Sequence, residues 1–484
     1  MILADLLKDV DNIREIKGST QMAVTGIAFD SRKVKPGNLF TCISGFETDG
    51  HKFAPKAVEA GASVIVAERD MSDLGVTCVV VENSRAAMAK LAAVYYGYPY
   101  RQFKLIGITG TNGKTTTTYL VKAVLEAEGH KVGLIGTNQN MVGQEIIPSK
   151  HTTPDALELM QLFKKMAEAG AAYVVMEVSS HALALDRVTA CIFDVVSFTN
   201  LTQDHLDFHK TLENYLQAKS VLFRIAKVGS VNADDPASEY LLAHNTCGQM
   251  MTYGIEKPCD LQAVNPQLMR NGVQFELAYQ GKKYPVSLGI PGKFSVYNAL
   301  TAIACLLQAG MEIQQILSHL KDAKGVKGRV EVVETGRDFT VIIDYAHTPD
   351  GLYNVIRTIR GFAKGRVVTV FGCGGNRDAG KRPKMGKIAS ELSDFCVVTS
   401  DNPRNENPDA IIEDILAGVK EGGGAYAVVP NRFEAIEYAL DHAQKDDIIL
   451  LAGKGHETYQ VLADRTIVFD EREIVHKLLD VSMV

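Results

Sequence analysis

Hydrophobic positions in the first part of the chain form short apolar runs between stretches of helical periodicity. The runs are Gly26–Phe29, Leu39–Ile43 and Ser63–Ala67, and the helical patterns cover Lys52–Ala60 and Ala86–Tyr96. Apolar runs of about four to eight residues between helical patterns are typical of alternating strands and helices. The pattern predicts a small α/β domain that ends near residue 99.

Longer apolar runs follow, at Lys104–Thr109, Val132–Ile135, Tyr173–Val178 and Asp194–Thr199. Strands that are apolar throughout are typical of parallel sheets covered by helices on both faces. From residue 100 to about residue 328, strand and helix patterns alternate. A last section repeats this alternation, with apolar runs at Val330–Val333, Phe339–Asp344, Val367–Phe371, Phe395–Ser400 and Asp447–Ala452. We therefore expect an α/β protein of three domains, 1–99, 100–328 and 329–484, with a doubly wound parallel sheet in the centre and a Rossmann-like domain at the end.

Composition agrees with several globular domains. The 484 residues are 46% hydrophobic and 22% charged, with a net charge of −6. The chain has no dense Lys/Arg stripe, so we expect no nucleic-acid binding. Its apolar runs are too short for a membrane span, its N-terminus lacks a signal-peptide pattern, and its eight cysteines are dispersed. We expect a cytoplasmic protein with buried thiols that does not bind a membrane.

The first candidate site is the turn after the Lys104–Thr109 run, which contains Gly110, Thr111, Asn112, Gly113, Lys114, Thr115 and Thr116. Glycines let backbone N–H groups approach phosphates, a lysine adds positive charge, and a threonine hydroxyl can bind Mg²⁺. The strict spacing requires glycine at position 108, but Ile108 stands there and Gly107 comes one residue early. A GKT triplet can also merely open a helix. The preceding strand and the following helix favour an ATP site.

Candidate metal ligands follow two later strands. Glu177 ends an apolar run, where an acid would lie beside the phosphate loop at the carboxyl edge of the sheet; a capping or surface glutamate is the alternative. His205 and His209 are four residues apart, but no cysteine is near and no glutamate lies between them, which argues against zinc. Asp204 and His205 suit Mg²⁺, or Asp204 caps a helix. Lys219, on a predicted helix, is by itself typical of a solvated lysine.

Four motifs in this order resemble the Mur ligases, and the resemblance covers nearly the whole chain: Gly107–Thr116, Glu177–His181, Asn200–Asp207 and Asp344–Asp350. It implies one domain each for a UDP-sugar, for ATP and for an amino acid. It also implies an ATP-dependent ligase of peptidoglycan synthesis, and hence a role in cell-wall growth, shape and division. Within the family, the chain is similar to the members that add meso-diaminopimelate to UDP-N-acetylmuramoyl-L-alanyl-D-glutamate through an acyl-phosphate. We expect a monomer.

The resemblance also implies roles for individual residues. Thr115 and Glu177 would hold one Mg²⁺, and His205 with a carbamylated Lys219 a second, because a carbamate offers oxygen ligands. Lys114 would act on the phosphates of ATP, and Asn298, Arg329 and Asp344 would complete the nucleotide site. The UDP-sugar peptide would contact Ser31, Phe46, Glu47, Thr48, Thr152, Thr153, Ser179 and Arg187. Leu185 replaces a glutamine that is common in the family, which puts the contacts of that turn in doubt.

The added amino acid is indicated by Asp401, Asn402, Pro403 and Arg404, after the Phe395–Ser400 run. A guanidinium binds a carboxylate and repels an ammonium, so Arg404 favours diaminopimelate, with its distal carboxylate, over lysine. This DNPR sequence resembles that of the diaminopimelate-adding members, although Asn407 replaces a common acid. Arg377, Gly453 and Glu457 match family positions around the amino acid, with Glu457 a candidate for the distal ammonium. The glycines of Gly372–Gly375 alone indicate only a Rossmann turn.

Some alternatives remain open. His347 is a candidate for orienting the last domain or the acyl-phosphate, but a lone histidine is otherwise structural. A folylpolyglutamate synthetase would share the ATP chemistry; the N-terminal section and the DNPR sequence argue against it. A P-loop switch or transport ATPase that ligates nothing would not need the amino-acid motifs of the last section.

Overall fold

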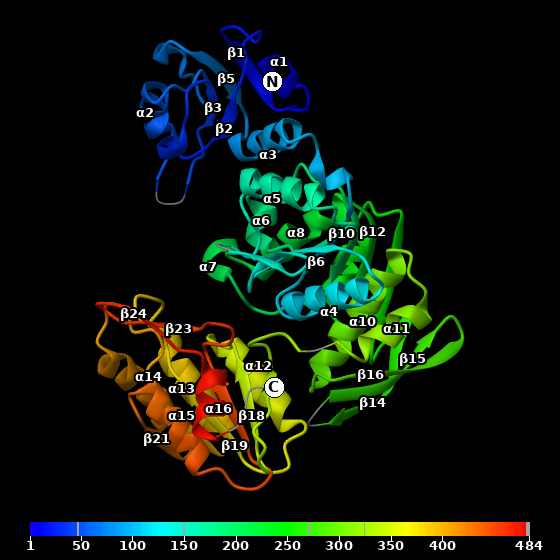
Figure 1. Ribbon diagram of the computed structural model, residues 1–484, viewed down its shortest axis with the longest axis vertical. Helices are drawn as coiled ribbons and strands as arrows, with labels where there is room; N and C mark the ends of the chain where they lie inside the picture. Colours follow the sequence, from blue (N-terminus) through cyan, green and yellow to red (C-terminus); the bar gives the residue numbers. More distant parts are fainter. Residues whose placement is uncertain (46–47, 149–150, 270–271, 324, 481–484) are drawn as a thin grey trace. The chain divides into compact units, whose positions relative to one another are not determined.

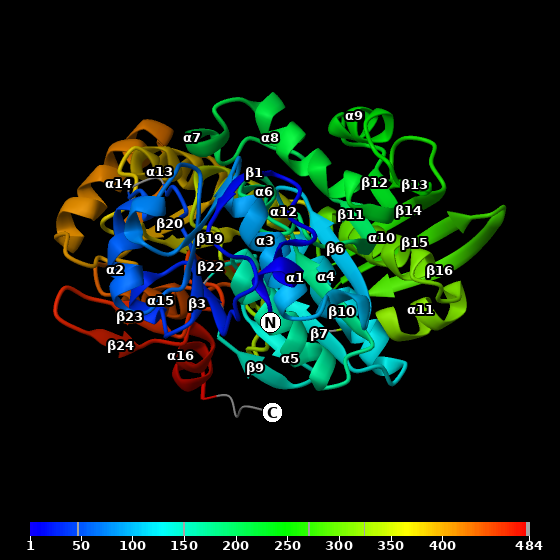
Figure 2. The ribbon, with the colours of Figure 1, turned by 90° about the horizontal axis from the view of Figure 1, so that it is seen from above.

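The computed structural model describes residues 1–45, 48–148, 151–269, 272–323 and 325–480. The chain divides into two compact units. Figures 1 and 2 show the helices and strands from two directions, coloured along the sequence. Unit 1 comprises Met1–Cys259 and Thr301–Ile316, and unit 2 comprises Asp260–Leu300 and Leu317–Val484. Helices α10 (Lys293–Gln308) and α11 (Ile313–Leu320) each contain a boundary between the units. The domain limits 1–99, 100–328 and 329–484 stay a prediction.

The first part of unit 1 is a sheet with the strand order β1-β5-β4-β3-β2, in which only β1 runs antiparallel to its neighbour. Helices α1 and α3 pack on one face of the sheet and α2 on the other. The elements are α1 (Leu3–Leu7), β1 (Ile13–Lys17), β2 (Gly26–Ala28), β3 (Asn38–Thr41), α2 (Ala54–Glu59), β4 (Val64–Ala67), β5 (Thr77–Val81) and α3 (Ser84–Tyr95). The predicted strands and helices of this part are confirmed. The edge strand β1 is largely exposed and charged, so no apolar run marks it.

The rest of unit 1 contains the strand order β13-β12-β11-β6-β10-β7-β8-β9. Strands β13 to β7 are parallel, and β8 and β9 are antiparallel additions. Its elements are β6 (Lys104–Thr109), α4 (Lys114–Ala127), β7 (Val132–Ile135), β8 (Asn140–Val142), β9 (Glu145–Ile147), α5 (Ala156–Glu168), β10 (Tyr173–Glu177), α6 (Ser180–Ala184), β11 (Phe193–Phe198), α7 (Leu206–His209), α8 (Leu212–Ser220), β12 (Ala226–Asn232), α9 (Ala237–Ala243) and β13 (Gln249–Gly254). Because β6 lies between β10 and β11, the turns that follow these three parallel strands meet at one sheet edge.

Unit 2 begins with an antiparallel meander, where strand and helix alternation had been expected. Its strands are β14 (Leu261–Met269), β15 (Gly272–Tyr279) and β16 (Lys282–Leu288). Alternating buried and exposed residues in β14 mark a sheet with one solvated face.

The second sheet of unit 2 has the order β17-β18-β22-β19-β20-β21 and is parallel except for β17. Helices α12, α13 and α14 cover one face, and α15 and α16 the other, as in a Rossmann-like fold. The elements are β17 (Glu331–Val333), β18 (Thr340–Asp344), α12 (Pro349–Arg360), β19 (Val367–Phe371), α13 (Lys381–Leu392), β20 (Phe395–Val398), α14 (Pro408–Gly422), β21 (Tyr426–Val428), α15 (Arg432–Asp441), β22 (Ile448–Ala452), β23 (Tyr459–Val461), β24 (Thr466–Val468) and α16 (Glu471–Leu478). The strands predicted here are confirmed.

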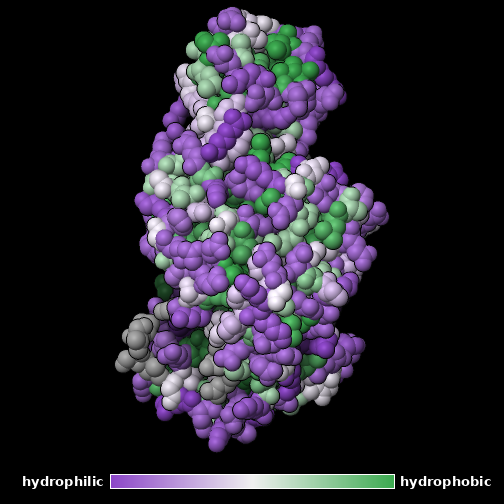
Figure 3. All heavy atoms as spheres, turned by 90° about the vertical axis from the view of Figure 1, so that its right-hand side faces the viewer, coloured by the Kyte–Doolittle hydropathy of each residue, from purple (hydrophilic) through white to green (hydrophobic). Residues whose placement is uncertain are grey.

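Hydrophilic side chains predominate on the face shown in Figure 3, where hydrophobic ones form small separate patches. No helix among the described residues is long and apolar enough to cross a bilayer. All eight cysteines are free thiols, and six are buried, whereas Cys247 and Cys259 are half-buried.

Candidate active site

The phosphate loop lies between the central strand β6 and helix α4. Gly110 and Gly113 have φ angles of 144° and 86°, which favour glycine, and a Cβ on Gly110 would lie 1.9 Å from Thr199 Oγ1. Lys114 Nζ donates to the carbonyl oxygens of Gly110 and Thr111 at 2.9 and 2.8 Å. Gly107 lies within β6, where a Cβ would approach the Phe193 ring at 2.7 Å, so this glycine serves strand packing rather than the loop.

Glu177 is at the centre of a buried cluster of oxygen-bearing side chains beside this loop. Its Oε2 accepts hydrogen bonds from Thr115 Oγ1 at 2.9 Å and from Thr137 Oγ1 at 3.0 Å, and its Oε1 accepts from Thr137 N at 2.8 Å. The side chain is 1% exposed at the carboxyl end of β10. Hydroxyl and carboxylate oxygens are hard donors, and this set fits Mg²⁺. Thr137 was not among the predicted residues.

Lys219 lies on the other side of the loop. It is buried, so the expectation that its side chain is solvated was wrong. Its Nζ donates to Gly110 O at 2.9 Å and lies 4.2 Å from the centroid of the Tyr215 ring. Burial lowers the pKa of Lys219 well below its ordinary value, and the charge of Lys114 lowers it further. Burial also raises the pKa of Tyr215 to about 12, and its hydroxyl lies 3.3 Å from Thr111 Oγ1. Tyr215 precedes Lys219 by one helical turn of α8, a spacing that would have identified it.

Three histidine rings gather next to Tyr215. The centroid of the His181 ring lies 4.7 Å from that of His205 and 5.5 Å from that of His209. The His205 and His209 centroids lie 6.2 and 5.0 Å from that of Tyr215. His205, not Asp204, is the N-cap residue of α7. Among the described residues, no group of three or more His, Cys, Asp or Glu side chains is arranged to hold a metal, so a site here needs other donors as well.

The predicted UDP-sugar residues of unit 1 partly assemble. Thr153 Oγ1 donates to Glu177 O at 2.9 Å and accepts from Ser179 N at 3.1 Å, and Thr152 Oγ1 lies 3.0 Å from Thr137 Oγ1. Arg187 donates to Thr153 O at 2.8 Å. Ser31 is the first residue of a short 3₁₀ helix, and Thr48 is exposed. Neither residue takes part in the hydrogen bonds just described. Phe46 and Glu47 lie outside the described residues. A small cavity of about 90 Å³ is lined by Phe29, Ile43, Arg85, Met88, Asp155, Ala156, Leu185 and Arg187.

In unit 2, the predicted nucleotide residues include two buried donors. Asn298 is 4% exposed, and no described residue accepts a hydrogen bond from its Nδ2 or from Arg329 Nε. The Arg329 guanidinium lies 5.1 Å from the centroid of the Tyr345 ring. Burial raises the pKa of Asp344, whose carboxylate accepts hydrogen bonds at 2.8 Å from the N–H groups of Val330 and Ala346. Buried donors without partners are sites where a ligand would be expected to bind.

His347 lies beside the same tyrosine. Its ring centroid is 4.6 Å from that of Tyr345, and its Nδ1 is 2.8 Å from Tyr345 O. The His347 carbonyl accepts a hydrogen bond from Lys381 Nζ at 2.7 Å. These contacts with Tyr345, two residues earlier in the chain, therefore orient the His347 ring.

The predicted amino-acid site forms at the carboxyl edge of the second sheet. Arg404 has a φ of 51°, and its NH1 donates to Gly375 O at 3.0 Å, with Asn402 O at 3.4 Å. Asn402 Nδ2 donates to Glu457 Oε2 at 3.0 Å. A Cβ on Gly453 would lie 2.7 Å from Asp401 Oδ2. The structure therefore brings Asp401, Asn402, Pro403, Arg404, Gly453 and Glu457 together, whereas Arg377 is exposed on the loop after β19.

Two further residues of this region have clear structural roles. Asn407 is the N-cap of α14, and its Oδ1 accepts from Asp409 N at 2.8 Å; asparagine caps a helix as well as an acid does, which accounts for the departure at this position. Lys454, which sequence reasoning missed, is completely buried between Asn402 and Glu457. Its place between the predicted Gly453 and Glu457 is the signal that could have found it.

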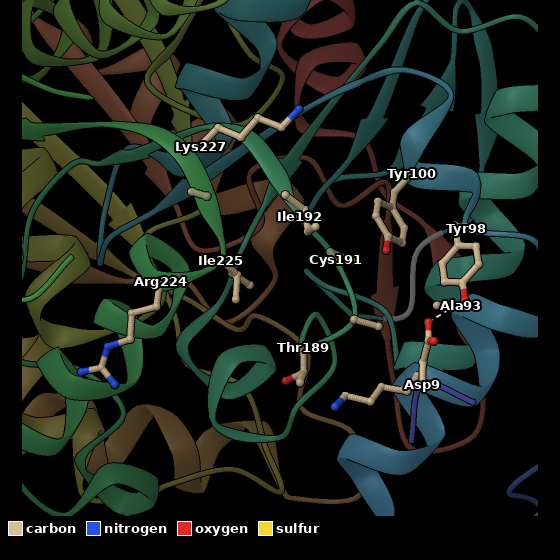
Figure 4. Close-up of a pocket in the computed structure, with 13 residues that line it drawn as sticks. Asp9, Ala93, Tyr98, Tyr100, Thr189, Cys191, Ile192, Arg224, Ile225 and Lys227 are labelled. Carbon is tan, nitrogen blue, oxygen red and sulfur yellow. Dashed lines mark hydrogen bonds between the residues drawn. The ribbon is translucent and has the colours of Figure 1, made fainter. Parts of the chain in front are cut away.

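A separate cavity of about 440 Å³ lies where β11 and β12 begin, at the sheet edge opposite the phosphate loop. Figure 4 shows Tyr98 and Tyr100 on one side, with Arg224, Ile225 and Lys227 on the other. Lys90 and Lys227 are paired with Asp11 and Asp194. Its remaining charges, Arg224 and Asp9, have opposite signs, so the cavity has no clear preference for a charged ligand.

Three family models match the chain in succession. They are the Mur ligase family catalytic domain over residues 23–96, the Mur ligase middle domain over 108–306, and the Mur ligase glutamate ligase domain over 328–455.

Whole-chain relatives carry one shared name. The UDP-N-acetylmuramoyl-L-alanyl-D-glutamate--2,6-diaminopimelate ligase of Caldanaerobacter subterraneus subsp. tengcongensis is 51% identical over 484 residues, or 99% of each chain. The ligase of the same name from Clostridium botulinum is 50% identical over 459 residues, or 94% of each chain. A solved structure of a ligase with this name has a TM-score of 0.72 and 31% identity, covering 96% of this chain and 97% of its own.

Proposed function

This chain belongs to the Mur ligase family, and we propose that it joins meso-diaminopimelate to UDP-N-acetylmuramoyl-L-alanyl-D-glutamate at the expense of ATP. The product is the UDP-sugar tripeptide used for peptidoglycan. The observation that supports this choice of amino acid is that Arg404 and Glu457 both contact Asn402: Arg404 NH1 lies 3.4 Å from Asn402 O, and Asn402 Nδ2 donates to Glu457 Oε2 at 3.0 Å. A guanidinium and a carboxylate match the carboxylate and ammonium at the distal end of diaminopimelate. Lysine offers only the ammonium.

The reaction has two steps. The terminal carboxylate of the dipeptide attacks the γ-phosphorus of ATP, so that ADP leaves and an acyl-phosphate forms. The amino group of diaminopimelate then attacks the acyl carbon, loses a proton, and displaces inorganic phosphate to leave the amide. Lys114, whose Nζ donates to two carbonyl oxygens of the loop, would balance charge on the transferred phosphoryl group, and the glycines would let the loop N–H groups approach phosphate oxygens. The chain contributes chiefly positioning and charge.

We infer that Thr115 and Glu177 hold one Mg²⁺, because their oxygens are 2.9 Å apart in a buried cluster. His205 and Lys219 would hold a second. When bound, Mg²⁺ offsets negative charge on phosphate groups. An ammonium would repel a cation, but the low pKa of Lys219 favours a neutral amine, which can add CO₂ and release a proton to form a carbamate. That carbamate is the oxygen donor proposed for this site.

The proposed reaction takes place in the cytoplasm, where ATP is made and used, and we propose that the enzyme works as a monomer. The substrates proposed are ATP, the UDP-sugar dipeptide and meso-diaminopimelate.

The test is phosphate release from ATP in the presence of UDP-N-acetylmuramoyl-L-alanyl-D-glutamate, with diaminopimelate or L-lysine as the amino acid. The natural protein should release phosphate only with diaminopimelate. Arg404→Ala should lower kcat/KM for diaminopimelate at least about 10-fold, because a charge-assisted hydrogen bond is lost. Arg360→Ala is the control, since Arg360 pairs with Asp394 at 2.7 Å elsewhere in unit 2.

Equal release with lysine would overturn the assigned amino acid. Release that needs no amino acid would favour the non-ligase ATPase. Release with a folate and glutamate in place of both substrates would favour a folylpolyglutamate synthetase.

A further inference from the structure

We propose that Lys454 is a positioning residue of the amino-acid site, which fixes the Glu457 carboxylate in the orientation that receives the distal ammonium of diaminopimelate. This inference rests on the proposed function, because it takes diaminopimelate as the amino acid. Lys454 would act through Asn402 and Glu457 and would not touch the substrate itself.

The contacts of Lys454 tie two segments of unit 2 together. Its side chain is 0% exposed, and its Nζ lies 3.1 Å from Asn402 Oδ1, 3.4 Å from Glu457 Oε2 and 3.8 Å from Asp401 Oδ1. Burying an ammonium is strongly unfavourable unless partners compensate for the lost water. Here the partners are all residues of the predicted amino-acid site. A lysine in this position therefore couples the turn after β20 to the loop after β22.

The two oxygens of Glu457 are not equivalent. Oε2 accepts hydrogen bonds from Asn402 Nδ2 at 3.0 Å and from Lys454 Nζ at 3.4 Å, whereas no described residue donates to Oε1. Asn402 is fixed in turn, because its Oδ1 accepts from Val461 N at 2.9 Å as well as from Lys454. With Oε2 held on this network, Oε1 is the acceptor that remains for a ligand.

Lys454 and Arg404 bring two positive charges to this site, and Asp401 and Glu457 bring two negative ones. Lys454 stands between two carboxylates, Asp401 and Glu457. The neighbouring buried pair of Arg432 and Glu471 neutralises itself, with a separation of 2.8 Å. The site can therefore accept a distal group that carries both a carboxylate and an ammonium without leaving an uncompensated charge.

The two groups that would bind the distal end of the ligand lie near one tyrosine. Burial raises the pKa of Tyr459, the charge of Glu457 raises it further, and the charge of Arg404 opposes this rise. Only NH1 of the Arg404 guanidinium has an acceptor among the described residues, so its Nε and NH2 remain for a carboxylate. Arg404 and Glu457 thus each have one side held by the protein and one side available.

The test compares meso-diaminopimelate with 2-aminopimelate, which lacks only the distal amino group. We would measure kcat/KM for both amino acids, and KM for ATP, in the natural protein, Lys454→Met, Lys454→Arg and the surface control Lys387→Met. The natural protein and the control should prefer diaminopimelate by about 10- to 100-fold, the effect of a charge-assisted hydrogen bond. Lys454→Met should reduce that preference to within about 3-fold, with Lys454→Arg in between and KM for ATP unchanged.

A merely structural role would lower both kcat/KM values equally and leave their ratio unchanged, and this outcome would overturn the proposal. If Lys454→Met does not fold, as judged by thermal unfolding, Lys454→Arg decides: a ratio equal to that of the natural protein rejects the positioning role. If the natural protein itself shows no activity that depends on diaminopimelate, the proposed function has failed, and the inference fails with it for a distinguishable reason.

Discussion

At the scale of single residues, Lys219 has the environment least suited to its charged form. It is 1% exposed, its Nζ donates to the carbonyl oxygen of Gly110, and burial and the charge of Lys114 both lower its pKa. Folding therefore disfavours the protonated form of Lys219, and this costs stability below the pKa of the unfolded chain. The same environment supports the carbamate proposed above.

We predict that Lys219→Met leaves the thermal stability unchanged or raises it, while phosphate release that depends on diaminopimelate falls at least about 100-fold. The matched control is Lys122→Met, because Lys122 is also buried but its ammonium is paired with Glu126 at 2.6 Å. That control should lose stability and keep its activity. Thermal unfolding and the phosphate assay check both variants; a strongly destabilised Lys219→Met would contradict the prediction.

At the scale of elements, the link between β6 and α4 depends on glycine geometry. Gly110 combines a φ of 144° with a Cβ position 1.9 Å from Thr199 Oγ1. Gly129, just after the end of α4, also has a positive φ, 86°, but a Cβ there meets nothing within 4 Å. A substitution at Gly110 would therefore cause both backbone strain and a steric clash, whereas the same substitution at Gly129 would cause backbone strain alone.

We predict that Gly110→Ala lowers the free energy of unfolding by more than about 2 kcal/mol and abolishes ATP-dependent phosphate release, because the loop must move away from Thr199. Gly129→Ala should cost only about 1 kcal/mol, the strain of a left-handed alanine, and keep its activity. Urea unfolding and the phosphate assay would check this pair. Equal losses in both variants would show that steric contact at Gly110 is unimportant.

At the scale of the whole molecule, stability should depend on pH through His456. Burial, together with the positive charges of Arg329 and Lys327, lowers the pKa of His456 to about 4. Between the ordinary pKa of about 6.5 and this value, the unfolded chain binds a proton that the folded protein does not. Stability is therefore lost as the pH falls through this window.

We predict that the natural protein loses roughly 1 to 2 kcal/mol between pH 7 and pH 5 through this residue. The variant His456→Gln has no imidazole to protonate at this position, so its stability should fall by roughly 1 to 2 kcal/mol less than that of the natural protein over the same pH range. Thermal unfolding of both proteins at the two pH values gives the difference between their slopes. Identical slopes would refute the assignment to His456, whatever other groups titrate.

Agreement between sequence and structure is best where local pattern and burial coincide. The strands around the phosphate loop were predicted because each is a continuous apolar run, and a buried parallel strand needs such a run. Strand β1 and the meander β14–β16 were not predicted, because strands that are exposed or that alternate between buried and exposed residues resemble ordinary polar segments. Gly107 lies within β6, as the apolar run Lys104–Thr109 predicted.

The sequence by itself determined the phosphate loop, the order of strands and helices that frames it, and the DNPR turn with its arginine, because these depend on residue types at short spacings. Only the tertiary structure decided the burial of Lys219, the convergence of Thr115, Thr137 and Glu177, and the contacts of Lys454. Those residues are far apart in the chain: Asn402 and Lys454 are separated by 52 residues, and Thr115 and Glu177 by 62. Local patterns carry no information on such distances, because burial and charge pairing arise only when separate strands end at the same edge of a sheet.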